Sequence, residues 1–198
     1  LREHFERLGQ SSKILTLQMH QAVDQLCEIA VELVERSGFT EDVYLRPMVY
    51  LSSEQLGVRL HNLESDTLIF LTPFPAYLPE VDRCHTSTWR RVQDTGIPPR
   101  AKVTGIYVNS ALAKSEANAN GFDEAIMLNE NGHVSEGSGE NIFMVRDGRL
   151  ITPTPADNVL EGITARSVME LAANELGVPI LQREIDRTEL YIADEVFM

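Results

Sequence analysis

Two stretches of the 198-residue chain carry side chains suited to covalent or acid–base chemistry. The first holds Lys102, which follows the proline-containing loop 96–100 and precedes the mostly apolar stretch 103–107. A lysine near neutral groups can have a lowered pKa and act as an amine nucleophile. An ordinary surface lysine is the alternative, and that is what we expect of Lys13 and Lys114.

The second stretch is a glycine-rich turn over residues 135–141, which contains Glu136 and Glu140. Two carboxylates in such a turn could bind a metal, orient a ligand or simply belong to the turn. No histidine or further carboxylate nearby completes a metal site, so we expect no metal.

Residues 160–166 place Gly162 and Thr164 at the start of a predicted helix. Free backbone N–H groups at a helix start could bind a phosphate. Capping of the helix by the Thr164 side chain is an equally simple explanation. The stretch is not a P-loop, because no Gly-Lys-Ser/Thr follows.

Two arginines in the first quarter of the chain are further candidates. Arg7 lies in a short helical pattern, where pairing with Glu3 is the alternative to a functional role. Tyr44 and Arg46 share one face of a predicted strand and could hold a carboxylate, although such a face is ordinarily just exposed.

Hydrophobic periodicity predicts the elements that must position these residues. In 162–177 we expect Val168, Leu171, Ala172 and Leu176 on the buried face. Asn131-Gly132 and Asp147-Gly148 are typical of hairpin turns. Strands in hairpins mixed with a few helices indicate an α+β fold. Helices are predicted over 20–37, 108–120 and 162–177, and strands over 43–51, 66–71, 124–129, 133–136, 142–146 and 178–185.

The prolines of residues 72–83 suggest a hinge between two lobes. We therefore expect a small lobe over 1–78, an interdomain loop over 79–84 and a larger lobe over 85–198. The chain begins without Met and ends in a strand-like run, so we expect a segment of a longer protein.

Composition narrows the classes of partner. Seventeen basic and thirty acidic residues give a net charge of −13, which argues against nucleic-acid or anionic-membrane binding. The best apolar run, residues 67–72, is far too short to span a bilayer. Two cysteines cannot build a disulfide framework, and a reduced, cytoplasmic location is expected.

An isolated lysine, then Ser135–Asn141, then Leu160–Thr164 occur together and in this order. The combination resembles the class IV aminotransferases, the pyridoxal-phosphate enzymes of fold type IV. The similarity continues through residues 2–8, 44–47 and 191–198. Within the class the chain looks most like branched-chain amino acid aminotransferase. D-amino-acid transaminase, aminodeoxychorismate lyase and a non-catalytic fragment of the fold remain alternatives.

The resemblance implies a role for each candidate residue. Lys102 would hold pyridoxal 5′-phosphate as a Schiff base and carry the proton. Glu136 would pair with the pyridine nitrogen, and Tyr107 would bond the ring hydroxyl. Tyr44 and Arg46 would line the substrate pocket. Leu160 would pack near the cofactor ring. The phosphate would be bound by Arg7, Ile163 and Thr164.

The resemblance also implies transamination between leucine, isoleucine or valine and 2-oxoglutarate, by a homodimer or larger homo-oligomer. Arg91 would approach the active site as well. The family's Gly/Thr/Ala turn after the strand 194–197 and its opening pair of strands are missing from this sequence.

Overall fold

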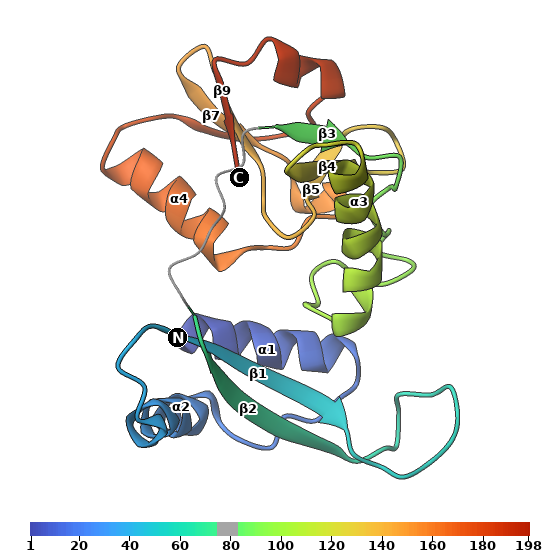
Figure 1. Ribbon diagram of the computed structural model, residues 1–198, viewed down its shortest axis with the longest axis vertical. Coiled ribbons are helices and arrows are strands. Elements are labelled where there is room, and N and C mark those ends of the chain that lie inside the picture. Colours follow the sequence, from blue (N-terminus) through green and yellow to red (C-terminus); the bar gives the residue numbers. More distant parts are fainter. Residues whose placement is uncertain (75–82) are drawn as a thin grey trace. The chain divides into compact units, whose positions relative to one another are not determined.

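The computed structural model describes residues 1–74 and 83–198. The chain divides into two compact units, Leu1–Glu80 and Val81–Met198. Figure 1 shows the elements of both units. Most of the interdomain loop expected over 79–84 lies outside the described residues, so the proposed lobe boundaries stay a prediction.

The first unit is a β-hairpin with two helices. Helices α1 (Arg2–Ile14) and α2 (Val23–Ser37) precede the antiparallel strands β1 (Val43–Leu51) and β2 (Ser65–Pro73). The bounds of β1 are those predicted, and its ladder with β2 is uninterrupted. Helix α2 ends at Gly38, whose φ of 72° is the left-handed conformation expected there.

The core of this unit lies where the two helices meet one face of the hairpin. Phe5 of α1 and Leu26 of α2 are fully buried, and they pack with Leu45 and Ile69 of the strands. Burying one apolar face of each element in this way is what holds a small α+β unit together.

The second unit contains two sheets. In the first, β3 (Cys84–Thr86) pairs in parallel with β4 (Glu124–Leu128), which pairs antiparallel with β5 (Val134–Gly137). The second has the order β8-β7-β6-β9. Its strands are β6 (Phe143–Arg146), β7 (Arg149–Thr152), β8 (Ile180–Gln182) and β9 (Glu195–Phe197). The predicted α+β class is confirmed.

Turn chemistry sets the hairpins of this unit. Asp147 and Gly148, between β6 and β7, both have positive φ, 51° and 68°. That pair of conformations is the tight hairpin turn predicted from the Asp-Gly dipeptide. Gly132 between β4 and β5 has a φ of 90°, again as the sequence indicates.

Helices flank these sheets. Helix α3 (Tyr107–Ala119) follows the 3₁₀ turn η1 (Thr104–Ile106), and α4 (Ile163–Asn174) follows the 3₁₀ turn η2 (Pro155–Asp157). A third 3₁₀ segment, η3 (Arg187–Tyr191), precedes β9. Small residues on α3, Ala113 and Ala117, are fully buried and let the helix pack closely on β4.

The predicted buried face of α4 is partly wrong. Leu171 and Leu176 are 59% and 74% exposed. The stripe that packs on β6 and β7 is instead Ala165, Val168, Met169 and Ala172. These four stand at i, i+3, i+4 and i+7, so the alanines set the phase of the helix and leave Leu171 off the stripe.

Two further expectations are corrected. The strand predicted over 178–185 is shorter, Ile180–Gln182, although Ile185 is buried and its carbonyl accepts a bond from the Val134 N–H. Lys114 is not on a solvated face. Its Nζ donates to Glu124 Oε2 at 2.5 Å and to the Asp123 carbonyl at 2.6 Å, joining α3 to β4.

Glu189 of η3 links three segments of the second unit. Arg183 donates to both of its carboxylate oxygens, at 2.8 and 2.7 Å, and Arg146 of β6 donates at 2.9 Å. These hydrogen bonds, chiefly those from Arg183, lower the pKa of Glu189 to about 2. The lowered pKa means that the ionised form stabilises the fold.

We expect Glu189→Gln to lower the free energy of unfolding of the full-length protein by about 1–2 kcal/mol at pH 7, because charge-assisted bonds become neutral ones. The contribution of the carboxylate is complete above its unfolded-state pKa of about 4.5 and is lost as pH falls toward 2. Urea unfolding at pH 7 and pH 3 tests this, with Glu175→Gln at the end of α4 as the control. An equal difference between wild type and variant at both pH values would contradict it.

Candidate active site

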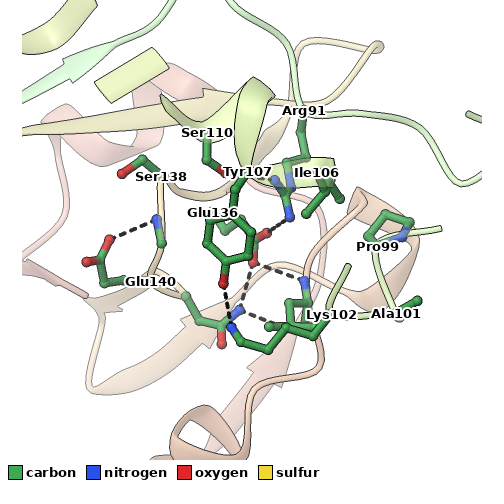
Figure 2. A pocket seen from close by; sticks show the side chains of 13 residues that line it. Arg91, Pro99, Ala101, Lys102, Ile106, Tyr107, Ser110, Glu136, Ser138 and Glu140 are labelled. Carbon is green, nitrogen blue, oxygen red and sulfur yellow. Dashed lines mark hydrogen bonds and ion pairs between the residues drawn. The ribbon is translucent and has the colours of Figure 1, made fainter. Parts of the chain in front are cut away.

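Lys102 and Tyr107 form the first part of the site. Lys102 lies in the loop before η1, and Tyr107 is the first residue of α3. The η1 turn between them brings the two side chains together, and Lys102 Nζ donates to the Tyr107 hydroxyl at 2.7 Å (Figure 2). An amine and a phenol in direct contact can exchange or share a proton.

Glu136 of β5 forms the second part, and it is 95% buried. Its Oε1 accepts a bond from the Arg91 guanidinium at 2.7 Å (Figure 2). Its Oε2 accepts bonds from the backbone N–H of Leu160 and from Asn141 Nδ2, both at 3.0 Å. The carboxylate is therefore bound by donors from three separate segments of the chain.

Arg91 is as buried as its partner. Besides Glu136, its guanidinium donates to Ser110 Oγ of α3 at 3.3 Å and to the Asn158 carbonyl at 3.4 Å. The Arg91 backbone N–H also bonds the Leu128 carbonyl, which fixes this residue to the end of β4. Arg91 thus stands beside Glu136, whereas the resemblance implied only that it would approach the active site.

Burial raises the pKa of Glu136 to about 7. The charge of Arg91, the Leu160 N–H and the charge of Lys102 all oppose this rise. A buried carboxylate without such partners would take up a proton. Arg91 is the nearest positive charge and does most to keep Glu136 ionised.

These groups line a single pocket of the second unit (Figure 2). Its wall combines two cations, two carboxylates, hydroxyls and a few apolar side chains. A mixed wall of this kind offers charged, hydrogen-bonding and apolar partners to a polar molecule. The lining residues are Arg91, Pro99, Ala101, Lys102, Ile106, Tyr107, Ser110, Glu136, Ser138, Gly139, Glu140, Asn141 and Leu160.

The predicted phosphate site follows the last pocket-lining residue in the chain, at the start of α4. Leu160 lines the pocket, Gly162 is the N-cap of α4, and Ile163 and Thr164 form its first turn. Capping by Thr164 is wrong, because no side chain caps this helix. The first N–H groups of α4 have no acceptor within the helix and carry the positive end of its dipole.

The remaining predicted site residues belong to the first unit. Arg7 is half-buried on α1. Tyr44 and Arg46 share one face of β1 as predicted, and Arg46 donates to the Tyr44 hydroxyl at 3.1 Å. Their roles toward cofactor and substrate stay predictions.

Sequence reasoning missed two residues of this site. Asn141 stood next to the glutamates of the glycine-rich turn, but nothing in the pattern showed that its amide would meet Glu136. Ser110 lies in the middle of an alanine-rich helix without any distinguishing signal. Both join the site through contacts between segments far apart in sequence.

No group of three or more His, Cys, Asp or Glu side chains in residues 1–74 and 83–198 is arranged to hold a metal ion. Within the same ranges, no helix combines the length and the apolar character needed to cross a bilayer. Cys27 and Cys84 are free thiols.

A family model described as "Amino-transferase class IV" matches residues 1–198. The chain belongs to the class IV aminotransferase family. It is 45% identical, over its whole length, to a probable branched-chain-amino-acid aminotransferase of Aquifex aeolicus. This class IV chain covers 64% of that relative, so it spans less than two thirds of its length.

Solved structures of the family agree with the class IV fold. A branched-chain aminotransferase from Thermoproteus uzoniensis with norvaline aligns with a TM-score of 0.95 at 47% identity, covering 100% of this chain and 66% of that one. A branched-chain amino acid aminotransferase from Escherichia coli aligns at 0.93 and 37% identity, with 100% and 66% coverage. A further branched-chain enzyme, complexed with N-(5′-phosphopyridoxyl)-L-glutamate, aligns at 0.91 and 41% identity, with 100% and 65% coverage.

Removal of Arg91 tests the electrostatics of the site. Arg91→Met removes the charged partner of the buried Glu136, and we expect it to cost about 3–5 kcal/mol of unfolding free energy at pH 7. Because the pKa of Glu136 is raised in the fold, protonation favours folding, and this benefit is lost as pH rises through that pKa. Without Arg91 the pKa rises further, so the loss continues to higher pH.

The difference in stability between wild type and Arg91→Met is therefore expected to widen from pH 5 to pH 8 in chemical denaturation. Arg100→Met is the matched control, because Arg100 is half-exposed in its ion pairs with Asp94 and Glu161. Exposed pairs contribute at most about 1 kcal/mol. A pH-independent difference for Arg91→Met would show that Glu136 does not depend on Arg91 for its charge.

Proposed function

We propose that the protein is a pyridoxal-phosphate-dependent transaminase that exchanges amino groups between branched-chain L-amino acids and 2-oxoglutarate. The observation that carries the proposal is one pocket holding the Lys102–Tyr107 pair and the buried Glu136–Arg91 pair. The similarity to proteins named branched-chain-amino-acid aminotransferase supports the substrate class.

The side chains of the pocket fit the cofactor. Pyridoxal phosphate has an aldehyde, a phenolic oxygen, a pyridine nitrogen and a phosphate, and each needs a different partner. The pocket and the adjoining helix offer an amine, a phenol, a buried carboxylate and a helix amino end. Oε1 of Glu136 accepts one hydrogen bond from Arg91, so it retains capacity for another donor.

When bound, the cofactor supplies an electron sink that makes the Cα proton of an amino acid acidic. Lys102 would hold the cofactor through Nζ and, as a neutral amine, take up and return that proton. Tyr107, already bonded to Nζ, would donate to the phenolic oxygen and orient the lysine.

Glu136 would keep the pyridine nitrogen protonated, which requires a carboxylate rather than a carboxylic acid. Arg91 opposes the effect of burial on the pKa of Glu136 and so favours that ionised form. A buried carboxylate paired with an arginine suits this position, because little water screens the electrostatic field of the carboxylate.

The phosphate would lie at the start of α4, where the backbone N–H groups of Ile163 and Thr164 are available. Arg7 would add a charged donor. Leu160 would pack against the ring beside the Glu136 carboxylate, to which its N–H is bonded.

Tyr44 and Arg46 would line the substrate pocket. Their side chains stack and hydrogen-bond on one strand face, with the guanidinium 5.1 Å from the ring centre. An arginine beside an apolar ring suits a pocket that accepts both aliphatic side chains and the carboxylate of glutamate. Relatives solved with norvaline and with a phosphopyridoxyl-glutamate compound support this dual specificity.

We further propose that the whole protein is cytoplasmic and assembles as a homodimer or larger homo-oligomer. Both proposals rest on its membership of the family. The net charge of −13 supports the accompanying expectation that it binds neither nucleic acid nor anionic membranes.

Lys102→Ala is expected to abolish transamination while the far-UV circular dichroism stays that of wild type, because no other amine would hold the cofactor. The measurement is visible absorbance of the full-length protein with pyridoxal phosphate, then with leucine. Wild type should convert to the pyridoxamine form with leucine and not with D-alanine. Lys13→Ala, on α1, is the control, and full activity of Lys102→Ala would overturn the proposal.

Glu136→Gln is expected to bind pyridoxal phosphate but to turn over leucine at least about 100-fold more slowly, because the ring nitrogen loses its charged partner. Stopped-flow absorbance of the half-reaction with leucine measures the rate. A wild-type rate would remove Glu136 from the proposed role, whereas loss of cofactor binding would assign it to affinity instead.

A further inference from the structure

The side chain of Asn141 joins two parts of the pocket that the sequence separates. Its Nδ2 donates to Glu136 Oε2 at 3.0 Å and to the Leu160 carbonyl at 2.9 Å. Both partners are acceptors only, so the amide can face them in one orientation alone. The orientation of this amide is therefore determined by its surroundings.

The bonds form a closed set. The Leu160 N–H donates to Glu136 Oε2 at 3.0 Å, while the Leu160 carbonyl accepts from Asn141. Leu160 is thus held at both its backbone donor and its backbone acceptor by the glycine-rich turn. Three residues later the chain enters the first turn of α4 at Ile163.

Gly162 shows how close this contact is. A Cβ on Gly162 would lie 2.0 Å from Asn141 Oδ1. The backbone of Gly162 has φ −71° and ψ 137°, which any residue can adopt. The glycine is therefore required by the neighbouring amide and not by its own conformation.

We propose that Asn141 is a positioning residue that sets the spacing between the Glu136 carboxylate and the amino end of α4. The inference rests on the proposed function, in which these two features hold the ring nitrogen and the phosphate of one molecule. A rigid ligand gains from both contacts only when their spacing matches its length. Gly162 is needed for this arrangement, because its lack of a side chain leaves room for the Asn141 amide to reach Glu136 and the Leu160 carbonyl.

The test compares two non-covalent probes, pyridoxine 5′-phosphate and pyridoxine. Neither carries the aldehyde that reacts with lysine, and they differ only in the phosphate. The dissociation constant of pyridoxine divided by that of pyridoxine 5′-phosphate, both for the full-length protein, reports how much the phosphate adds to the affinity once the ring is bound. Isothermal titration calorimetry or competition with pyridoxal phosphate measures both constants.

We expect Asn141→Ala to reduce this ratio by about tenfold or more, because the ring and phosphate contacts no longer fit together. Asn120→Ala is the matched control. The Asn120 amide also donates to a backbone carbonyl, that of Glu116 at 2.8 Å, but it lies at the end of α3 away from the lining residues. The control should leave the ratio unchanged.

Gly162→Ala gives an independent test. Alone, it should reduce the ratio as Asn141→Ala does, because the new methyl group displaces the amide. In the Asn141→Ala background the same change meets no amide and should add little, so the two effects are non-additive. Additive effects of the two substitutions would overturn the proposal.

The outcomes separate this inference from the proposed function. Wild type that binds neither probe contradicts the proposed function. Wild type that prefers the phosphorylated probe, together with an unchanged ratio in Asn141→Ala, contradicts only the role of Asn141. Weaker binding of both probes by the same factor would mean that Asn141 stabilises the fold without setting the spacing.

Discussion

The second unit of the protein is built around the need to satisfy one buried carboxylate. Glu136 is placed in a strand interior, where an ionised group without partners would be strongly unfavourable. Its donors come from residue 91, from residue 141 and from the backbone of residue 160. Bringing these three segments together requires β4, β5 and the approach to α4 to be in place, so the site and the fold form as one structure.

The two parts of the pocket differ in how they are assembled. Lys102 and Tyr107 are five residues apart and are joined by a single 3₁₀ turn, so their contact is local. The contacts of Glu136 reach back to residue 91 and forward to residue 160, and they depend on packing across the unit. The Lys102–Tyr107 contact therefore depends mainly on the local chain, whereas a change near Glu136 affects stability and chemistry together.

The same division explains what could be predicted. Local signals indicated the Asp147-Gly148 turn and the bounds of β1 correctly. The phase of α4 was missed because Leu171 and Leu176 offered a competing helical pattern of larger apolar side chains. The pairing of Lys114 with Glu124 was missed because an ion pair between two elements leaves no periodic pattern in the sequence. Lys102, Tyr107 and Glu136 were named as candidates through an ordered resemblance, and the structure brings them to one pocket. The bond from Asn141 to Glu136 could come only from the structure.

Charge adds a last constraint on the site. The chain carries −13 overall, yet the amino acids, oxo acids and phosphate proposed to bind are anionic or zwitterionic. Arg91 and Lys102 balance Glu136 and Glu140 in the pocket wall, so the wall is close to neutral. Salt screens the distant acidic residues beyond roughly 8 Å. Attraction for an anion must then come from short-range donors, and those proposed here are Arg7, Arg46 and the backbone N–H groups of the first turn of α4.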